Sequence, residues 1–196
     1  MSTVPITYLT PEQYLELDRA SDTKHEYWYG EVFAMAGGSP PHSYVINRIQ
    51  TALTNRLEDR DCGVFNADLR VSVRWDTLIA YPDVTVVCGE PKYVDDRQDT
   101  VTNPILVVEV LSPSTAIKDR GAKAVLYRQV PSMREILLVE PSPVFIEHYW
   151  KLANGHWELE TVIDQSAAIR FPSLDCEIPV GEIYRKVEMF TRAQQL

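Results

Sequence analysis

Three charged residues in the middle of the chain have types and spacings that could do chemistry. Glu109 interrupts the apolar run 105–111, whose β-branched and aliphatic residues predict a buried strand. Further along, Asp119, Lys123 and Tyr127 are four residues apart, so a helix would place them on one stripe. An isolated carboxylate in a core strand is costly unless it is paired, neutralised or bound to a metal. A strand carboxylate followed by a helix that directs a lysine back at it therefore predicts a functional site.

A second carboxylate, Asp83, follows Pro82 and precedes the apolar run 84–87. Asp83 and Glu109 thus belong to two predicted core strands separated by one connection, and neighbouring strands lie about 4.8 Å apart. Two carboxylates at that spacing repel each other unless a cation lies between them. A hard divalent ion such as Mg²⁺, with oxygen ligands at about 2.1 Å, would satisfy both. Two simpler interpretations stay open: a structural ion pair between Glu109 and Lys123, and an Asp83 that only accepts hydrogen bonds from loop amides.

The composition is that of an ordinary globular protein and limits the possible functions. The chain has 196 residues, of which 45% are hydrophobic and 24% charged, which is enough for one well-filled core. No apolar run approaches the roughly 20 residues that span a bilayer, and the N-terminus lacks the layout of a secretion signal, so we expect a cytoplasmic protein without a membrane partner. The three cysteines are far apart and predict buried structural thiols rather than a disulfide framework or a zinc site: Cys62, Cys88 and Cys176.

The net charge of −9 argues against a protein that coats nucleic acid non-specifically, because phosphate contacts need cations. The charge is unevenly distributed, however. Between residues 118 and 128 one acid, Asp119, stands among four cations: Lys118, Arg120, Lys123 and Arg128. This local excess of positive charge permits an anionic substrate at the predicted helix, although such a group is most often a solvated face.

Hydrophobic periodicity and turn signals give the order of the elements. We expect a helix opening at Thr10-Pro11-Glu12, a hairpin over 25–35 around Gly30, a helix from Ser43 to near Asp59, strands over 64–74, 78–88 and 105–111, a helix capped by Ser114 or Thr115, a strand over 136–139, a hairpin over 144–163 and a short helix in the tail 178–196. The apolar face of the helix after residue 115 should consist of Ala122, Val125, Leu126 and Val130. This succession is that of an α/β sandwich with a mixed central β-sheet flanked by helices, and we expect residues 1–196 to form a single domain.

These motifs resemble the PD-(D/E)xK nuclease superfamily and, more narrowly, the Uma-type family of restriction endonucleases. The resemblance rests on Pro82-Asp83, on Glu109 within VVEVLSPST and on the D-x-x-x-K-x-x-x-Y stripe. The opening segment HEYWYGEVFAMAGGSPPHS is also similar to that family, and the likeness extends over roughly residues 8 to 150. The superfamily usually has lysine two residues after the glutamate, where this chain has Leu111; in the narrower family the lysine lies on the next helix, where Lys123 matches it.

The resemblance implies a restriction-endonuclease-like core with N-terminal and C-terminal β-hairpin additions, and a Mg²⁺-dependent endonuclease that acts on DNA. Asp83, Glu109 and the carbonyl of Val110 would hold Mg²⁺, with Mn²⁺ as a substitute, and Lys123 would position the attacking water. Glu26, and less so Glu31, would add a ligand or a base, and His42 would contact phosphate or the metal water. A homodimer is expected, since two strands need two cuts.

Each of these residues also has a simpler interpretation. Glu26 and Glu31 lie in an acidic stretch, where solvated hairpin charges are common. His42 follows two prolines and could be a helix N-cap. Two functional classes therefore stay open: a metal-dependent phosphodiesterase, and a catalytically silent binding or assembly module with the same fold.

Overall fold

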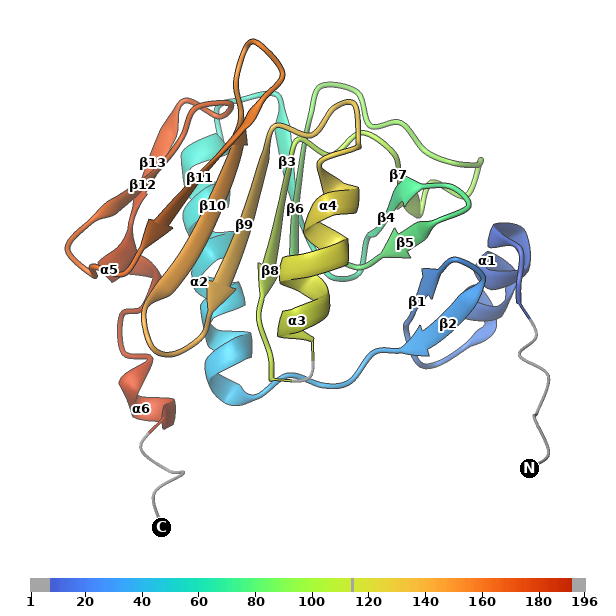
Figure 1. The fold of residues 1–196 in the computed structure, drawn as a ribbon, viewed down its shortest axis with the longest axis horizontal. Coiled ribbons are helices and arrows are strands. Elements are labelled where there is room, and N and C mark those ends of the chain that lie inside the picture. The colour runs from blue at the N-terminus through green and yellow to red at the C-terminus, as the bar shows by residue number, and fades with distance from the viewer. Residues whose placement is uncertain (1–7, 114, 192–196) are drawn as a thin grey trace.

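The computed structural model describes residues 8–113 and 115–191 and has a mixed α/β fold (Figure 1). Its helical segments are α1 (Pro11–Ala20), α2 (Pro40–Leu57), α3 (Ala116–Lys118), η1 (Asp119–Lys123), α4 (Ala124–Tyr127), α5 (Val180–Ile183) and α6 (Glu188–Thr191). Its strands are β1 (His25–Trp28), β2 (Glu31–Ala34), β3 (Cys62–Asn66), β4 (Arg70–Arg74), β5 (Leu78–Ala80), β6 (Val84–Cys88), β7 (Thr100–Val101), β8 (Leu106–Val110), β9 (Glu135–Glu140), β10 (Phe145–Lys151), β11 (Trp157–Val162), β12 (Ala168–Phe171) and β13 (Cys176–Pro179). The predicted fold class is confirmed.

A six-stranded sheet in the order β11-β10-β9-β8-β6-β3 forms the centre of the fold. The pair β8–β9 is parallel and the other pairs are antiparallel, so the sheet is mixed. Parallel neighbours need a crossover connection, and here the segment α3–η1–α4 provides it. Every residue of β8 is buried, which explains why its sequence is a nearly continuous apolar run.

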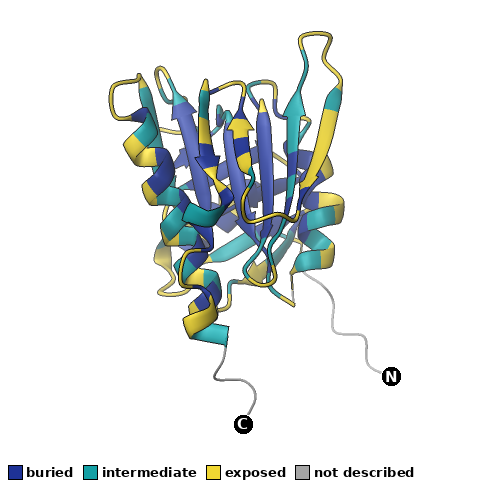
Figure 2. Cartoon of the chain, turned by 90° about the vertical axis from the view of Figure 1, so that its left-hand side faces the viewer, coloured by how far each residue is buried: buried dark blue, intermediate teal, exposed yellow. Residues whose placement is uncertain are grey.

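The two faces of this sheet are covered by different elements (Figure 1). Leu106, Val108 and Val110 pack with α2, the β12–β13 hairpin and α5. Val107 and Leu111 pack on the opposite face with α4 and with a second sheet of order β2-β1-β5-β4-β7. Figure 2 shows the consequence: the central strands are dark blue, and the exposed residues of the helices lie on their outer sides. Glu109 shares the face of Val107 and Leu111, as strand alternation predicted.

Two predicted strands are each divided by a turn. The expected strand 64–74 is β3 followed by β4, because Asn66 Oδ1 accepts a hydrogen bond of 3.1 Å from the amide of Asp68 and closes a tight turn. The expected strand 78–88 is β5 followed by β6, with the break at Pro82, which has no amide hydrogen to donate. In both cases the chain moves between the small sheet and the central one.

The helix that follows β8 contains a π-helical turn, η1, between the short α-helical segments α3 and α4. The amide of Ala124 bonds to the carbonyl of Asp119, five residues back. This wide turn changes the residues that face the core: Ala124 and Tyr127 are buried, whereas Ala122 and Val125 are exposed, contrary to expectation. The expected cap Ser114 lies outside the described residues, and Thr115 is the N-cap without a side-chain cap hydrogen bond.

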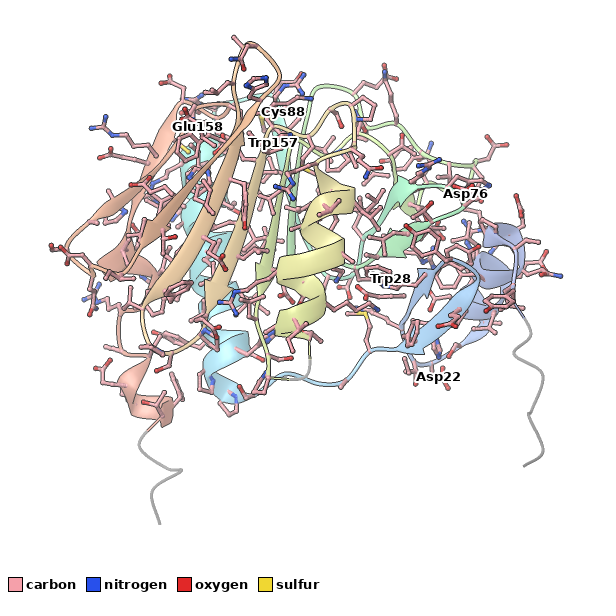
Figure 3. The ribbon with its side chains drawn as sticks, in the orientation of Figure 1. Asp22, Trp28, Asp76, Cys88, Trp157 and Glu158 are labelled. Carbon is pink, nitrogen blue, oxygen red and sulfur yellow. A yellow bond between two sulfur atoms is a disulfide. The ribbon has the colours of Figure 1, made fainter. Side chains whose placement is uncertain are left out.

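The cysteine prediction was wrong for two of the three thiols. Cys62 and Cys88 are directly opposed on the antiparallel pair β3–β6 and form a disulfide. Cys88 lies at the end of β6, towards the top of the view in Figure 3. Cys176 is a free, partly buried thiol on β13. The pairing depends on strand register, which the separation of 26 residues between the two cysteines does not reveal.

The C-terminal part contains a hairpin that was not expected. Residues 144–163 form the predicted β10–β11 hairpin, but β12 and β13 then form another, and Ile178 belongs to β13 rather than to a helix. The expected tail helix is divided into α5 and α6. Over the described residues, no helix combines the length and the hydropathy needed to cross a membrane.

Candidate active site

Three elements bring charged side chains together around Lys123: β1, β8 and the π turn η1. The ammonium lies 2.7 Å from Glu26 Oε1 on β1, 2.9 Å from Glu109 Oε1 on β8 and 3.5 Å from Asp119 Oδ1 on the same π turn. Lys123 is only 4% exposed. Its three carboxylate neighbours hold the pKa of Lys123 well above its usual value in spite of the burial that opposes it, so the side chain is protonated at neutral pH.

The Glu109 carboxylate, on β8, is buried, with 5% of the residue surface exposed. Tyr127 donates a hydrogen bond of 2.6 Å to the same oxygen, Oε1, that contacts Lys123. Burial raises the pKa of Glu109 to about 8, although the Lys123 ammonium opposes this effect. The carboxyl group therefore lies near the boundary between its neutral and its ionised form at physiological pH.

Asp83 lies at the start of β6, beside β8 in the antiparallel sheet. Its Oδ2 accepts a hydrogen bond of 2.7 Å from the amide of Val110, the last residue of β8, so Asp83 bonds a strand amide and not the loop amides of the simpler interpretation. Burial raises the pKa of Asp83, and the charges of His42 and Lys123 act against it. Asp83 and Glu109 thus flank Val110 at the same end of two neighbouring strands.

His42, on α2, approaches Asp83. Its Nε2 is 3.8 Å from Asp83 Oδ2, too far for a hydrogen bond but close enough for an electrostatic contact. Among the described residues nothing pairs with its buried Nδ1 atom. The N-cap of α2 is Ser39 and the helix begins at Pro40, so the alternative of His42 as a cap is wrong.

The predicted site residues thus come together, with two differences from expectation. Among the described residues, the Lys123 ion pairs are with Glu26, Glu109 and Asp119, whereas the charge of Glu31 acts on Lys118. Asp119 and Tyr127 were recognised as part of the helical stripe but not as members of the site, and both contact its central groups. Their spacing of four residues on either side of Lys123 is the signal that could have identified them.

The site has more negative than positive charge. Carboxylates from four positions influence one another across it, while one ammonium lies among them: Glu26, Asp83, Glu109 and Asp119 around Lys123. No group of three or more His, Cys, Asp or Glu side chains is arranged to hold a metal ion within residues 8–113 and 115–191. The side-chain oxygens available to a cation at the strand ends are therefore those of Asp83 and Glu109, with backbone oxygens as the remaining protein donors.

Other polar clusters in the molecule have structural explanations. Arg70 donates to Asp18 at 2.9 Å and to Tyr81 at 2.7 Å, which fixes α1 on β4 and satisfies all three buried groups. His148 Nε2 lies 2.7 Å from Glu135, and the hydroxyl of Ser173 donates to the same carboxylate. The Ser173 hydroxyl donates its hydrogen bond to the Glu135 carboxylate and not to His148. In a catalytic triad the histidine accepts that hydrogen bond, so this group is not arranged for nucleophilic catalysis.

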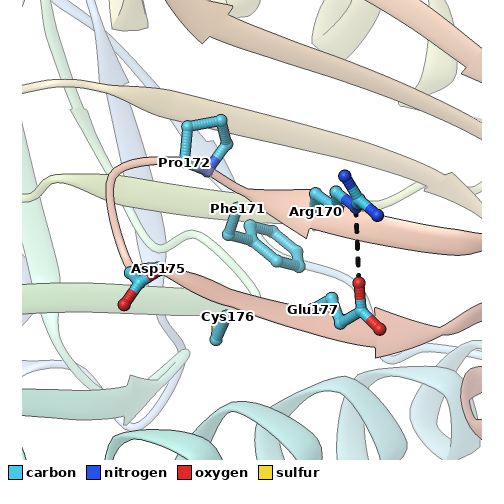
Figure 4. Close-up of a pocket in the computed structure, with 6 residues that line it drawn as sticks. All are labelled: Arg170, Phe171, Pro172, Asp175, Cys176 and Glu177. Carbon is cyan, nitrogen blue, oxygen red and sulfur yellow. Dashed lines mark ion pairs between the residues drawn. The ribbon is translucent and has the colours of Figure 1, made fainter.

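A surface pocket of about 410 Å³ lies on the β12–β13 hairpin, away from β1 and η1 (Figures 1 and 4). It is lined by Arg170, Phe171, Pro172, Asp175, Cys176 and Glu177. Arg170 and Glu177 form an exposed ion pair of 3.4 Å there. None of the predicted site residues lines this pocket.

Comparison with known proteins gives the same grouping as the motifs. The family model described as "Uma2: Putative restriction endonuclease" matches residues 11–181. Two proteins of Synechocystis sp. (strain ATCC 27184 / PCC 6803 / Kazusa) are similar to this chain. Uncharacterized protein slr1290 is 39% identical, over 92% of this chain and 94% of the Synechocystis protein. Uncharacterized protein sll1609 is 34% identical, over 83% of this chain and 92% of the Synechocystis protein.

A solved structure has the same fold. The crystal structure of a "putative nuclease belonging to DUF820" from Anabaena variabilis ATCC 29413 matches with a TM-score of 0.75, 15% identity, and coverage of 91% of this chain and 99% of the other. At that identity the likeness establishes the fold. With the family model extending over most of the chain, this protein belongs to the Uma2 family of restriction-endonuclease-like proteins.

Proposed function

We propose that this protein is a metal-dependent endonuclease that hydrolyses phosphodiester bonds in DNA. The observation that carries the proposal is the excess of buried carboxylate around Lys123. Buried acids without full compensation are expensive, and a divalent cation is the usual means of compensating them. The matching family and the Anabaena protein are both described as nucleases, which supports the same reaction class.

The donor set of the site fits Mg²⁺. Asp83 and Glu109 supply hard carboxylate oxygens from adjacent strand ends, and the carbonyl of Val110 is the third ligand that we propose between them. Mg²⁺ commonly takes only one or two protein carboxylates and completes its shell with water and substrate phosphate, so a larger cluster of acidic side chains is not required. When bound, the ion would lower the pKa of a coordinated water and withdraw charge from the phosphate.

Lys123 has the role of a fixed positive charge in this proposal. Because its pKa is raised by the acids around it, the ammonium does not accept a proton at neutral pH and is not the general base. Its donors orient a water or a phosphate oxygen and stabilise charge that develops in the transition state. Glu26 Oε1 contacts the ammonium at 2.7 Å, and in this proposal its carboxylate takes a proton from that water.

DNA as substrate and a homodimer belong to the same proposal. The net charge of −9 opposes binding to a polyanion through the general surface, so recognition would depend on cations at the site itself. A dimer would provide two sites for the two strands of a duplex. Nicking and double-strand cleavage of a plasmid distinguish one active subunit from two.

The first test is metal binding by calorimetry with Mn²⁺ in place of Mg²⁺. The wild-type chain should bind the ion, Asp83→Ala should bind it at least tenfold more weakly, about the effect of losing one of few ligands, and the exposed Asp22→Ala is the matched control. Equal and weak binding by all three chains would remove the chemical basis of the enzyme.

The second test is cleavage of supercoiled plasmid with Mg²⁺. Lys123→Met should lose at least about 100-fold in rate, the usual cost of removing a charge-stabilising group, while Lys92→Met, an exposed lysine on the loop after β6, should cleave normally. Activity on mononucleotides with none on plasmid would instead assign the site to small phosphates.

A catalytically silent binding or assembly module is the second candidate, and a specific observation favours it. The Lys123 ammonium contacts Glu26, Glu109 and Asp119, and in doing so fills the position where a cation would compensate those acids. If plasmid is bound but not cut under any metal condition, this second function replaces the first.

A further inference from the structure

The β1–β2 hairpin places Glu26 in the candidate site, and the hairpin pairs with the neighbouring strand β5 over a short stretch. β1 pairs with β5 through only Tyr27–Ile79 and Trp28–Leu78, and β2 is the outer strand of the small sheet. Glu26 therefore lies beyond the last backbone pair that ties the hairpin to the rest of the sheet. The backbone of the preceding residue, His25, is held by side chains of α1, because its amide donates to Asp18 Oδ1 at 2.7 Å and its carbonyl accepts from the Tyr14 hydroxyl at 2.6 Å. The position of the Glu26 carboxylate itself depends on side-chain contacts on the other face of the hairpin.

The two faces of the hairpin contact different elements. Glu26 pairs with Phe33 across the hairpin, and Trp28 pairs with Glu31, so alternation places all four side chains on the same face. On the opposite face, Tyr27 packs against Tyr14 of α1 at a ring distance of 5.4 Å. The face with Glu26 therefore points away from α1.

The helical segment after β8 presents two lysines to this face. Lys123 contacts Glu26 at 2.7 Å, and the Lys118 ammonium lies 4.0 Å from the centre of the Trp28 ring and 4.3 Å from the centre of the Phe33 ring. Lys118 is the last residue of α3, immediately before the π turn, and it is partly buried. Trp28 is 8% exposed and lies between the hairpin and this helix (Figure 3). An ammonium between two aromatic rings is a favourable cation–π arrangement.

We propose that Lys118 is a positioning residue that fastens the β1–β2 hairpin to the helix and so holds Glu26 against Lys123. The two lysines use the same hairpin face and the same helix, so a shift of the hairpin away from Lys118 also moves Glu26 away from Lys123. Lys118 itself touches neither Glu109 nor Asp83 and acts through Glu26. The inference rests on the proposed function and names one more residue on which the reaction depends.

The test is a double-mutant cycle on plasmid cleavage with the full-length chain. Lys118→Met keeps a chain of similar length without the charge and should lower kcat by about tenfold, within the range that a partly desolvated cation–π contact spans, while KM stays the same. In the Glu26→Gln background the same substitution should cost nothing further. Lys118→Arg should restore most of the rate, because a guanidinium also stacks on aromatic rings. The matched control is Lys92→Met.

Three outcomes would overturn the inference. An equal loss in both backgrounds would mean that Lys118 acts independently of Glu26, a rise in KM with unchanged kcat would mean that it binds substrate, and an undiminished kcat in Lys118→Met would mean that it has no role. If the wild-type chain cleaves nothing, the proposed function fails, and amide hydrogen exchange then decides the inference alone. Lys118→Met should speed exchange of the β1–β2 amides about tenfold, whereas unchanged exchange would refute the fastening.

Discussion

Replacing Glu109 by glutamine should change the way in which stability depends on pH. Glutamine has the same shape, keeps an oxygen that can accept the 2.6 Å hydrogen bond from Tyr127, and does not titrate. Lys123 retains Glu26 and Asp119 as partners in the variant. The substitution therefore removes one ionisation from a buried site and preserves most of its packing.

The size of the effect follows from the pKa of Glu109, which burial raises from 4.5 to about 8 in the folded chain. A carboxyl with a raised pKa binds its proton more tightly in the folded state than in the unfolded state. Stability is therefore lost as pH rises from 4.5 to about 8, and the loss is about 1.36 kcal/mol per pH unit, or about 4 kcal/mol between pH 5 and 8.

Urea denaturation in EDTA, followed by tryptophan fluorescence from pH 5 to pH 9, measures this loss. Between pH 5 and pH 8 the unfolding free energy of the wild type should fall by about 4 kcal/mol more than that of Glu109→Gln. Glu158→Gln makes the same chemical change at an exposed position of β11 and should follow the wild-type curve. Parallel curves for wild type and Glu109→Gln would refute the electrostatic account of the site. Added Mg²⁺ should reduce the wild-type loss, because a cation favours the ionised carboxylate.

Further perturbations test other parts of the structure. Tyr127→Phe removes the donor to a buried carboxylate and should cost about 2 kcal/mol in urea unfolding; a cost near zero would contradict the hydrogen bond. Reduction of the Cys62–Cys88 disulfide should cost about 3.5 kcal/mol for its separation of 26 residues, checked by urea unfolding with and without a thiol reductant, and an unchanged midpoint would argue against the bond. Arg70→Met leaves the Asp18 carboxylate buried without its cation and should lower stability by about 3 kcal/mol or more; a loss below about 1 kcal/mol would mean that water reaches the cluster.

The sequence was sufficient for those parts of the fold that depend on local patterns. The start of α1, the turn at Gly30 and the buried strand β8 follow from residue types within a few positions of each other. The Cys62–Cys88 disulfide and the π turn η1 depend on register and on tertiary packing, which no short window of sequence contains. The β12–β13 hairpin was missed because each strand has only four residues, which is too short for its alternation of buried and exposed positions to stand out in the sequence.

The candidate site divides in the same way. Strand ends and helical spacing were enough to place Asp83, Glu109 and Lys123 near one another, because neighbouring elements along the chain are usually neighbours in space. Glu26 arrives from a hairpin of the second sheet, and only the family resemblance singled it out among the acids of its segment. The roles of these residues in catalysis stay predictions.

The π turn that carries Asp119 and Lys123 has a consequence for how this protein can change by insertion and deletion. Such a turn holds one residue more than an α-helix needs between the same two ends. Loss of a single residue inside η1 would restore an ordinary α-helix and leave α4 and β9 in register, while it would shorten the spacing between Asp119 and Lys123 from four residues to three. A one-codon deletion could thus rearrange the charged residues of the π turn and spare the fold, whereas the same deletion within α4 would rotate the helix and its buried Tyr127 out of the core.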